Sequence, residues 1–360
     1  MTTIIICTII ILLIIYIYYI YNHGENFINY KQCSNSNINS VINSRIKKVF
    51  DNYTYDPHDW DLYLPCGYTD AESELRNVKF NNNKQSIFAI DGCDKLASKS
   101  SLANLLKKKY GTGYSNYIPK SYLNNSNDIH LLLQNHQYGN KYIAKKNIQQ
   151  QKGIHIIHDY KEVKKIVNDK SFVIIQELLN NPFLINGHKI NIRIYLLITC
   201  KGGVISSYIH SNGFMYYTPD AFDYESKKDS SHITTGYISR KIYSKNPLTL
   251  QDFYNYLDKN GYNSEKFNHN IHGLFRNVMT AINPGICKTT LSNNNLLFQL
   301  FGADIAPDNN LNVKLIEINK GPDLGGKDIQ DNRVKNSVVK DIFKTIGSIP
   351  DKNNGFKKIW

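Results

Sequence analysis

A predicted β-hairpin in the last quarter of the chain carries three side chains that could bind a metal ion. Its strands, Leu297–Ile305 and Asn312–Asn319, flank a Pro-Asp-Asn-Asn turn, which is a strong hairpin signal. The turn brings Asp304 back to the level of Glu317, and Asn319 follows on the same strand. Burying two carboxylates without a counter-charge is costly, and hard oxygen ligands suit Mg²⁺. The pattern therefore indicates a magnesium site. The alternative is an exposed hairpin end that pairs with two neighbouring lysines, Lys314 and Lys320.

Two other predicted strands carry cations on one face, because side chains alternate along a strand. In Lys189-Ile-Asn191-Ile-Arg193 the isoleucines form the core face, which leaves two cations and an amide on the other face. Such a stripe suits phosphate and ribose oxygens, since an arginine fork can hold a phosphate through two hydrogen bonds. The alternative is an ordinary solvent-exposed sheet face. Of the adjacent Lys145 and Lys146, one must point inward if both strand faces are covered, and an inward lysine needs an anion.

The elements that position these residues are typical of a mixed α/β fold built around antiparallel strands. On the second hairpin strand, alternation places Val313, Leu315 and Glu317 on one face. Helices are expected at 95–110, 129–136, 160–168 and 265–282, and one more begins after Thr249. Besides the hairpin, strands are expected at 86–90, 142–146, 153–158, 172–177, 189–200 and 204–210.

The N-terminal run Ile4–Tyr21 is apolar, uncharged and long enough to span a bilayer. A cleaved signal peptide is the alternative, but Met1-Thr2-Thr3 lacks the basic start of one. Basic residues follow the run and none precedes it, which predicts a single-pass membrane protein with its large C-terminal part in the cytosol. We divide the chain into a transmembrane anchor (1–21), a linker and N-terminal region (22–85), two lobes (86–181 and 182–348) and a tail (349–360).

Composition narrows the class of partner. With 43 Lys and Arg against 30 Asp and Glu, the chain carries a net charge of +13, and 41% of its residues are hydrophobic. The apolar content excludes a mainly disordered chain, and the charge predicts an acidic partner. Basic residues are scattered without a recognised motif, which argues against nucleic acid. None of the six cysteines lies in a C-x-x-C pair, which is typical of free thiols in a reducing compartment.

The ordered set of motifs over residues 86–346 resembles the tubulin–tyrosine ligase family of the ATP-grasp superfamily. The matching segments are Phe298-Gln-Leu-Phe-Gly-Ala-Asp304, Val313-Lys-Leu-Ile-Glu317-Ile-Asn319, Val173-Ile-Ile-Gln176 through Pro182, Lys189-x-Asn191-Ile-Arg193, Ile143-Ala-Lys145 and His232-Ile-Thr234. The resemblance implies an ATP-grasp fold with a nucleotide cleft between two antiparallel-sheet lobes. It also implies ATP and Mg²⁺ as cofactors, and a reaction that joins a free amino acid to a protein carboxylate. Tubulin or another acidic polypeptide is the implied acceptor.

The resemblance also assigns roles to individual residues. Phosphate contacts are implied for Lys99 and Lys145, with Arg193 at the γ-phosphate; all three would be catalytic. Adenine would meet the hinge Gln176, Glu177, Leu178 and Leu179, while Lys189 and Asn191 would lie near the ribose. His232, Thr234 and Thr235 would line the same cleft, Lys152 would be the cation of a short phosphate flap, and Asp304, Glu317 and Asn319 would hold magnesium.

Four departures from the family pattern bear on activity. Asn191 replaces a carboxylate, Tyr216 stands where a phosphate-facing arginine is expected, and Thr235 ends the His-x-Thr step where the family has asparagine. The flap is reduced to Gln149–Gly153. Loss of one arginine from a phosphoryl-transfer site costs transition-state stabilisation unless another cation replaces it, and Lys152 and Arg240 are the candidates. The alternative function is a catalytically weakened, membrane-tethered module that binds a nucleotide or an acidic protein.

Overall fold

The computed structural model describes most of the chain after the N-terminal run. The described residues are Ile11, 27–33, 40–68, 71–135, 140–147, 153–236, 238–288, 294–351 and 353–360. The predicted membrane span, Ile4–Tyr21, lies outside them apart from Ile11. Within the described part of the chain, no helix is long and apolar enough to cross a membrane. The membrane anchor therefore stays a prediction.

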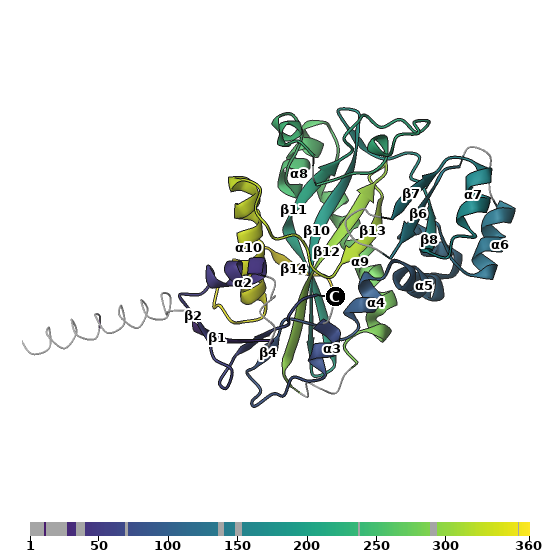
Figure 1. Ribbon diagram of the computed structural model, residues 1–360. Coiled ribbons are helices and arrows are strands. Elements are labelled where there is room, and N and C mark those ends of the chain that lie inside the picture. The colour runs from purple at the N-terminus through teal and green to yellow at the C-terminus, as the bar shows by residue number, and fades with distance from the viewer. Residues whose placement is uncertain are drawn as a thin grey trace, which may run out of the picture.

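A ten-stranded sheet runs through the centre of the molecule (Figure 1) in the order β14-β11-β10-β12-β4-β3-β1-β2, with β13 beside β12 and β9 beside β10. Its strands are β1 (Phe27–Gln32), β2 (Asn52–Tyr55), β3 (Leu62–Leu64), β4 (Ser86–Ile87), β9 (Leu184–Ile185), β10 (His188–Lys201), β11 (Val204–Tyr217), β12 (Leu296–Pro307), β13 (Val313–Asn319) and β14 (Phe356–Lys358). The strands from β9 to β14 pair antiparallel, whereas β1 to β4 pair parallel with one another, and β4 pairs parallel with β12. The large sheet is therefore mixed rather than antiparallel throughout.

Helices cover both faces of this sheet. On one face, α8 (Leu250–Lys259) and α9 (Ser264–Ile282) pack against the alternate isoleucines of β10, such as Ile192 and Ile194. On the other face, α10 (Ile329–Thr345) and α2 (Ser40–Lys47) pack against the apolar half of β10 and β12. Tyr195 and Leu197 belong to that second core, and Lys189, Asn191 and Arg193 continue the same face of β10 beyond it. The polar stripe of Lys189, Asn191 and Arg193 thus begins at the point on β10 where the cover by α10 and α2 ends.

A second sheet of four antiparallel strands forms a separate lobe, on the right in Figure 1, in the order β5-β8-β6-β7. Its strands are β5 (Ser121–Leu123), β6 (Tyr142–Lys146), β7 (Ile154–Ile157) and β8 (Phe172–Glu177). Helices α6 (Ser126–Asn135) and α7 (Tyr160–Ile166) bury its outer face through residues such as Tyr142 and Val163. The remaining helices are α3 (Ala71–Leu75), α4 (Cys93–Ala97), α5 (Lys99–Tyr110) and the 3₁₀ turns η1 (Gly111–Asn116), η2 (Asp229–Ser231), η3 (Arg240–Ser244) and η4 (Asn283–Gly285).

Three features of the fold differ from the sequence-based expectation. The described part of the expected linker is built into the fold, because β1 joins the large sheet and α2 buries Ile42 and Ile46 under α10. The expected helix at 95–110 is two helices, since Ser98 is extended and its hydroxyl accepts a hydrogen bond from the Ser101 amide of α5. Helix α10 and strand β14 were not predicted. The boundaries between the two lobes stay a prediction.

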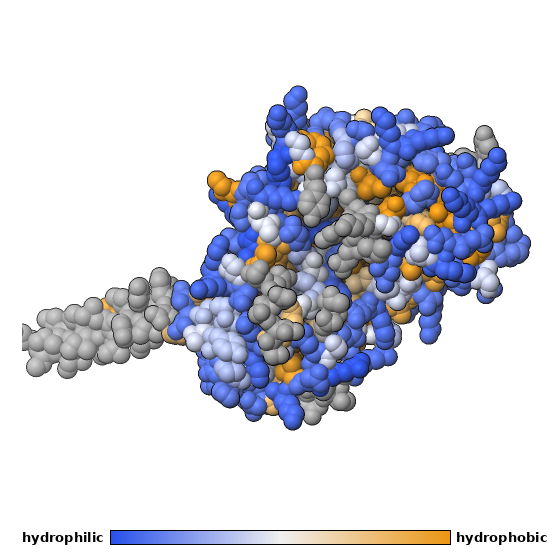
Figure 2. All heavy atoms as spheres, in the orientation of Figure 1, coloured by the Kyte–Doolittle hydropathy of each residue, from blue (hydrophilic) through white to orange (hydrophobic). Residues whose placement is uncertain are grey.

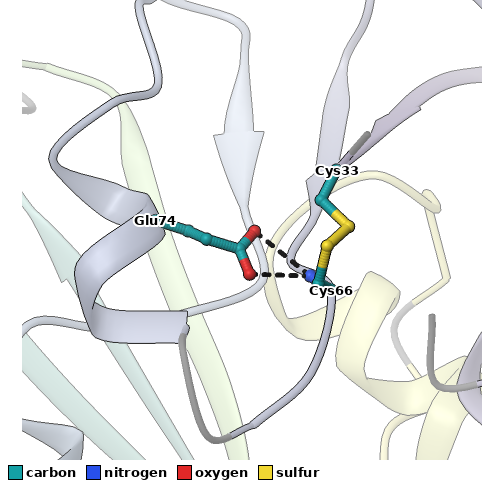
Figure 3. A group of neighbouring side chains, drawn as sticks. All are labelled: Cys33, Cys66 and Glu74. Carbon is teal, nitrogen blue, oxygen red and sulfur yellow. Dashed lines mark hydrogen bonds between the residues drawn. A yellow bond between two sulfur atoms is a disulfide. The ribbon is translucent and has the colours of Figure 1, made fainter. Parts of the chain in front are cut away.

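The expectation of free thiols is wrong for four of the five described cysteines. Cys33 and Cys66 form a disulfide between the ends of β1 and β3, with Cα atoms 5.2 Å apart. Figure 3 shows both oxygens of Glu74 accepting hydrogen bonds from the Cys66 amide, at 3.0 and 3.1 Å. Cys200 and Cys287 form a second disulfide. The two cysteines of each disulfide are 33 and 87 residues apart in the sequence, so short-range cysteine motifs could not predict either pair. Disulfides are typical of oxidising compartments, so the cysteines no longer support a cytosolic location.

Candidate active site

A cleft of about 330 Å³ lies between the two sheets. The four-stranded sheet contributes Ile143 and Lys145 from the face opposite its helices, and the large sheet contributes the polar stripe of β10. In the space-filling view, the molecular surface is mainly hydrophilic, and exposed apolar side chains gather on the side of the four-stranded sheet (Figure 2). The cleft is lined by Pro119, Ile143, Lys145, Ile154, Gln176, Glu177, Leu178, Leu179, Lys189, Asn191, Arg193, Tyr216, His232, Ile233, Thr234, Gly236, Asp304, Ile316, Glu317, Asn319, Gly321, Asp323 and Lys327.

The polar stripe of β10 points into this cleft. Lys189, Asn191 and Arg193 all line it, while the intervening Ile190 and Ile192 are fully buried in the core under α8 and α9. The strand alternation that predicted the stripe is therefore confirmed. Lys145 of β6 also lines the cleft, and it is only 5% exposed. The prediction that one of the two adjacent lysines points inward is therefore confirmed.

A β-bulge at Ile316 sets the direction of the hairpin carboxylate. Asp304 pairs with Glu317 in the β12–β13 register, but the next residue, Ile305, pairs with Leu315. Ile316 is the extra residue, so Leu315 stays buried in the core while Glu317 lines the cleft. The prediction that Glu317 shares a face with Leu315 is wrong for this reason. The prediction that the turn brings Asp304 opposite Glu317 is confirmed.

Asp304 is held by a two-pronged ion pair. Nε and Nη2 of Arg193 donate hydrogen bonds to its two carboxylate oxygens, at 2.6 and 3.1 Å, and Asp304 is 8% exposed. Burial nevertheless raises the pKa of Asp304, and the neighbouring carboxylate of Glu317 raises it further against the effect of Arg193. The alternative of an exposed, lysine-paired hairpin end is wrong, because Lys320 pairs with Asp94 and Lys314 donates to a backbone carbonyl.

Glu317 lies opposite Asp304 and also close to two lysines, Lys99 and Lys145. The ammonium of Lys99, at the start of α5, lies 3.9 Å from its Oε2, and Nδ2 of Asn319 donates to its Oε1 at 3.2 Å. Burial alone would raise the pKa of Glu317, but the charges of Lys145, Lys99 and Arg193 and the hydrogen bond from Asn319 together lower that pKa. Two carboxylates and an amide oxygen thus meet on one strand pair. Hard oxygen donors in this arrangement fit Mg²⁺, which would also relieve the repulsion between Asp304 and Glu317.

Lys145 and Lys189 are buried cations with no carboxylate within 4 Å among the described residues. Burial is the main cause that lowers the pKa of each lysine to about 8. The Nζ of Lys189 donates to the carbonyl of His232 at 3.0 Å. Buried ammonium groups of this kind are stabilised by an anionic ligand, and the phosphate chain of a nucleotide carries the required negative charge.

Two hydrogen-bond acceptors in the same region are also unsatisfied. The side-chain oxygen of Asn191 and Nδ1 of His232 are buried without a hydrogen-bond partner in the described part of the chain. Because Nε2 of His232 donates to the carbonyl of Ser226 at 2.8 Å, its Nδ1 is left as an acceptor. A hydroxylated ligand such as a ribose would supply donors to both atoms. We call Lys189, Asn191 and His232 the lysine end of the cleft, and Arg193, Asp304, Glu317 and Asn319 the hairpin end. Lys145 lies between the two ends, because its charge interacts with those of Glu317 and Asp304.

Comparison with known proteins assigns the family. The family model described as the tubulin-tyrosine ligase family matches residues 79–355. The chain belongs to this family. It is 27% identical to the human protein "Probable tubulin polyglutamylase TTLL2" over 86% of this chain and 54% of that relative. It is 24% identical to human "Tubulin polyglutamylase TTLL6" over 86% of this chain and 37% of the relative. With "Tubulin glycylase 3B" of Drosophila melanogaster it shares 25% identity over 51% of this chain and 25% of the relative. The chain thus spans about half, or less, of the length of these relatives.

Most residues assigned from the family resemblance lie together in the cleft. The hinge residues Gln176 to Leu179 line it at the edge of β8. Two assigned residues in the described part of the chain do not line it: Thr235 bridges to Tyr217, and Lys99 lies behind Glu317 in a small adjoining pocket. The assignment of Lys152 lies outside the described residues and stays a prediction.

Sequence reasoning missed several residues that line the cleft, among them Gly236, Asp323 and Lys327. Asp323 and Lys327 belong to the loop between β13 and α10, whose sequence Gly321-Pro-Asp-Leu-Gly-Gly-Lys327 directly follows the hairpin. A glycine-rich loop that carries both charges so close to candidate metal ligands is a signal that could have found them.

Proposed function

We propose that this family member is an ATP- and Mg²⁺-dependent ligase that joins an amino acid to a carboxylate of an acidic polypeptide, tubulin being the first candidate. Glutamate, glycine and tyrosine are the candidate amino acids, and the polyglutamylases among the relatives favour glutamate. The observation that carries the proposal is that Asp304 and Glu317 meet across the hairpin in a cleft walled by Lys145, Lys189 and Arg193.

In the proposed reaction the acceptor carboxylate takes the terminal phosphoryl group of ATP, which forms an acyl-phosphate and ADP. The amine of the amino acid then attacks the acyl carbon, and phosphate leaves. Bound Mg²⁺, held by Asp304, Glu317 and Asn319, would neutralise charge on the transferring group. The residues of the chain position the nucleotide: Lys145 meets its phosphates, Lys189 lies near the ribose, and the acceptor oxygen of Asn191 meets a ribose hydroxyl.

Incorporation of a labelled amino acid tests the proposal. The full chain, incubated with Mg·ATP and tubulin, should incorporate labelled Glu, Gly or Tyr. Glu317→Gln should lower incorporation roughly 10²–10³-fold, because it removes a ligand charge while keeping the side-chain shape. Glu265→Gln, the same change at an exposed site of α9, is the matched control and should have no effect. If Glu317→Gln and Glu265→Gln behave alike, the metal assignment fails.

The second candidate function is nucleotide or acidic-protein binding without turnover. It is favoured by Asn191 and Tyr216, which stand in the cleft where the family pattern has a carboxylate and an arginine. Mg²⁺-dependent ATP binding without modification of any acceptor would support this function over the ligase.

We further propose that residues 4–21 anchor the chain in a membrane with its C-terminal part in the cytosol, on the basis of the basic residues that follow the run. The two disulfides favour the opposite side. A glycosylation reporter fused after Trp360 decides between them, because its modification would place the domain in the lumen.

A further inference from the structure

The wall of the cleft beyond Arg193 lacks the cation that the family pattern leads one to expect. Tyr216 occupies the position of the family's phosphate-facing arginine, opposite Asn191 in the β10–β11 register. Its ring lies 5.3 Å from the guanidinium carbon of Arg193. Burial raises the pKa of Tyr216 well above its ordinary value, so its hydroxyl is neutral. Arg193 itself is engaged by Asp304. Neither side chain therefore places an uncommitted positive charge on this wall.

Arg240, one of the two cations expected to compensate, is engaged elsewhere. It forms an ion pair with Asp328 and lies over the ring of Tyr243, 4.7 Å from its centroid. It is absent from the residues that line the cleft. Lys152, the other candidate, lies outside the described residues.

Lys327, from the loop between β13 and α10, reaches the wall instead. Its Nζ donates a hydrogen bond to the carbonyl of Gly236. A methyl group added at Gly236 would lie 3.2 Å from Cε1 of Tyr216 and 3.7 Å from Nζ of Lys327. The ammonium and the edge of the tyrosine ring are therefore close neighbours, separated by a residue that has no side chain.

The main chain of Lys327 is held by hydrogen bonds to α10. Its amide donates to Asp331 of α10 at 2.7 Å, and the next residue, Asp328, caps that helix by accepting from the Asp331 amide at 2.8 Å. Lys335 ties Asp331 in turn through a 3.1 Å ion pair. Lys327 thus belongs to an anchored loop and lines the cleft, with its ammonium held at the carbonyl of Gly236, another lining residue.

We propose that Lys327 supplies the cation that meets the terminal phosphoryl group of the bound nucleotide, in place of the arginine that Tyr216 has replaced. This inference rests on the proposed function, because it needs a nucleotide in the cleft. A lysine can serve because its ammonium binds a phosphate as a point charge, although without the two-pronged geometry of an arginine.

Comparison of two nucleotides isolates the contact, since only one of them has the terminal phosphate. The full chain should bind Mg·AMPPNP and Mg·ADP in calorimetry. Lys327→Ala should weaken AMPPNP binding about 10-fold or more and change ADP binding less than about 2-fold, because a charged hydrogen bond to one phosphate is lost. Lys327→Arg should retain AMPPNP binding. Lys340→Ala, which removes an exposed charge from the same helix region, is the control for net charge.

A rescue variant keeps the result specific. Tyr216→Arg in the Lys327→Ala background should restore the preference for AMPPNP, because it returns a cation to the same wall. The proposal is overturned if Lys327→Ala weakens both nucleotides equally, weakens neither, or lowers amino-acid incorporation while AMPPNP binding is unchanged. If the unaltered chain binds neither nucleotide, the proposed function fails first and this inference fails with it.

Discussion

At the hairpin end of the cleft the charged side chains are paired with one another, whereas at the lysine end the buried groups have no such partners in the described part of the chain. Arg193 grips Asp304, and Glu317 lies beside Lys99 and Asn319. At the other end, the oxygen of Asn191 and Nδ1 of His232 are without hydrogen bonds. The hairpin end is therefore preassembled by its own charges. At the lysine end, buried polar groups without partners lower the free energy of unfolding, and a bound ligand would supply those partners. Mutations at the two ends should therefore change the free energy of unfolding without ligand in opposite directions.

The largest effect is expected at the preassembled end. Arg193→Met should lower the free energy of unfolding by about 3–5 kcal/mol, because it leaves the Asp304 carboxylate buried, unpaired and close to Glu317. The double variant Arg193→Met/Asp304→Asn should lose clearly less, since it removes both charges. Urea unfolding without nucleotide measures both changes. Equal losses in the single and double variants would mean that the pair does not preassemble this end.

At the lysine end, Lys189→Met should have the opposite signature. It removes a buried charge while keeping a side chain of similar length, so the free energy of unfolding without ligand should stay the same or rise. Nucleotide affinity should fall roughly 10–100-fold, because a charged hydrogen bond to the ligand is lost. Urea unfolding and calorimetry of Mg·AMPPNP give the two numbers. A large loss of stability with unchanged affinity would make Lys189 a structural residue and remove the contrast between the ends.

A pH titration sharpens the same contrast. The pKa of Lys145 and of Lys189 is lowered to about 8 in the folded chain, against about 10.4 for an unperturbed lysine. Between these values the unfolded chain binds more protons than the folded chain, so the free energy of unfolding without ligand should rise with pH, by at most about 1.4 kcal/mol per pH unit for each lysine. Nucleotide affinity should fall over the same range as the amines lose their charge.

The unfolding titration from pH 8 to 9.5 should be steeper for the unaltered chain than for Lys189→Met. That difference reports on Lys189 together with its repulsion from Lys145, because the buried tyrosines are present in both proteins. Parallel titrations would show that Lys189 already has an ordinary pKa. Lys340→Met is the matched control, since this lysine is exposed and its loss should leave the slope unchanged.

The parts of the site that were predictable depend on strand periodicity. Lys189, Asn191 and Arg193 alternate with isoleucines over an unbroken strand, and period-two alternation fixes which side chains share a face. Asp304 and Glu317 are brought together by a short turn, which is a local signal. Both inferences need only neighbouring residues, and both agree with the structure.

The parts that were missed depend on contacts between residues far apart in the sequence. The bulge at Ile316 breaks the alternation without any glycine to mark it. The β1–β3 pairing and the Cys200–Cys287 disulfide join segments whose own sequences carry no signal for each other. Lys327 reaches the cleft only because α10 anchors its loop, and α10 was itself not predicted. Local periodicity could therefore identify one wall of the cleft but not the loop that contributes Asp323 and Lys327 to it.

The smallest effect is expected for the unsatisfied amide of the lysine end. Asn191→Ala removes a buried acceptor that has no donor among the described residues, so the free energy of unfolding without ligand should not fall by the amount usual for a lost hydrogen bond. Nucleotide affinity should fall about 5-fold, which corresponds to about 1 kcal/mol for one hydrogen bond to the ligand. Asn191→Asp keeps the acceptor and should keep the affinity. If Asn191→Ala lowers the free energy of unfolding and leaves nucleotide affinity unchanged, the amide stabilises the fold rather than the bound ligand. The proposed contrast between the two ends of the cleft would then not hold at Asn191.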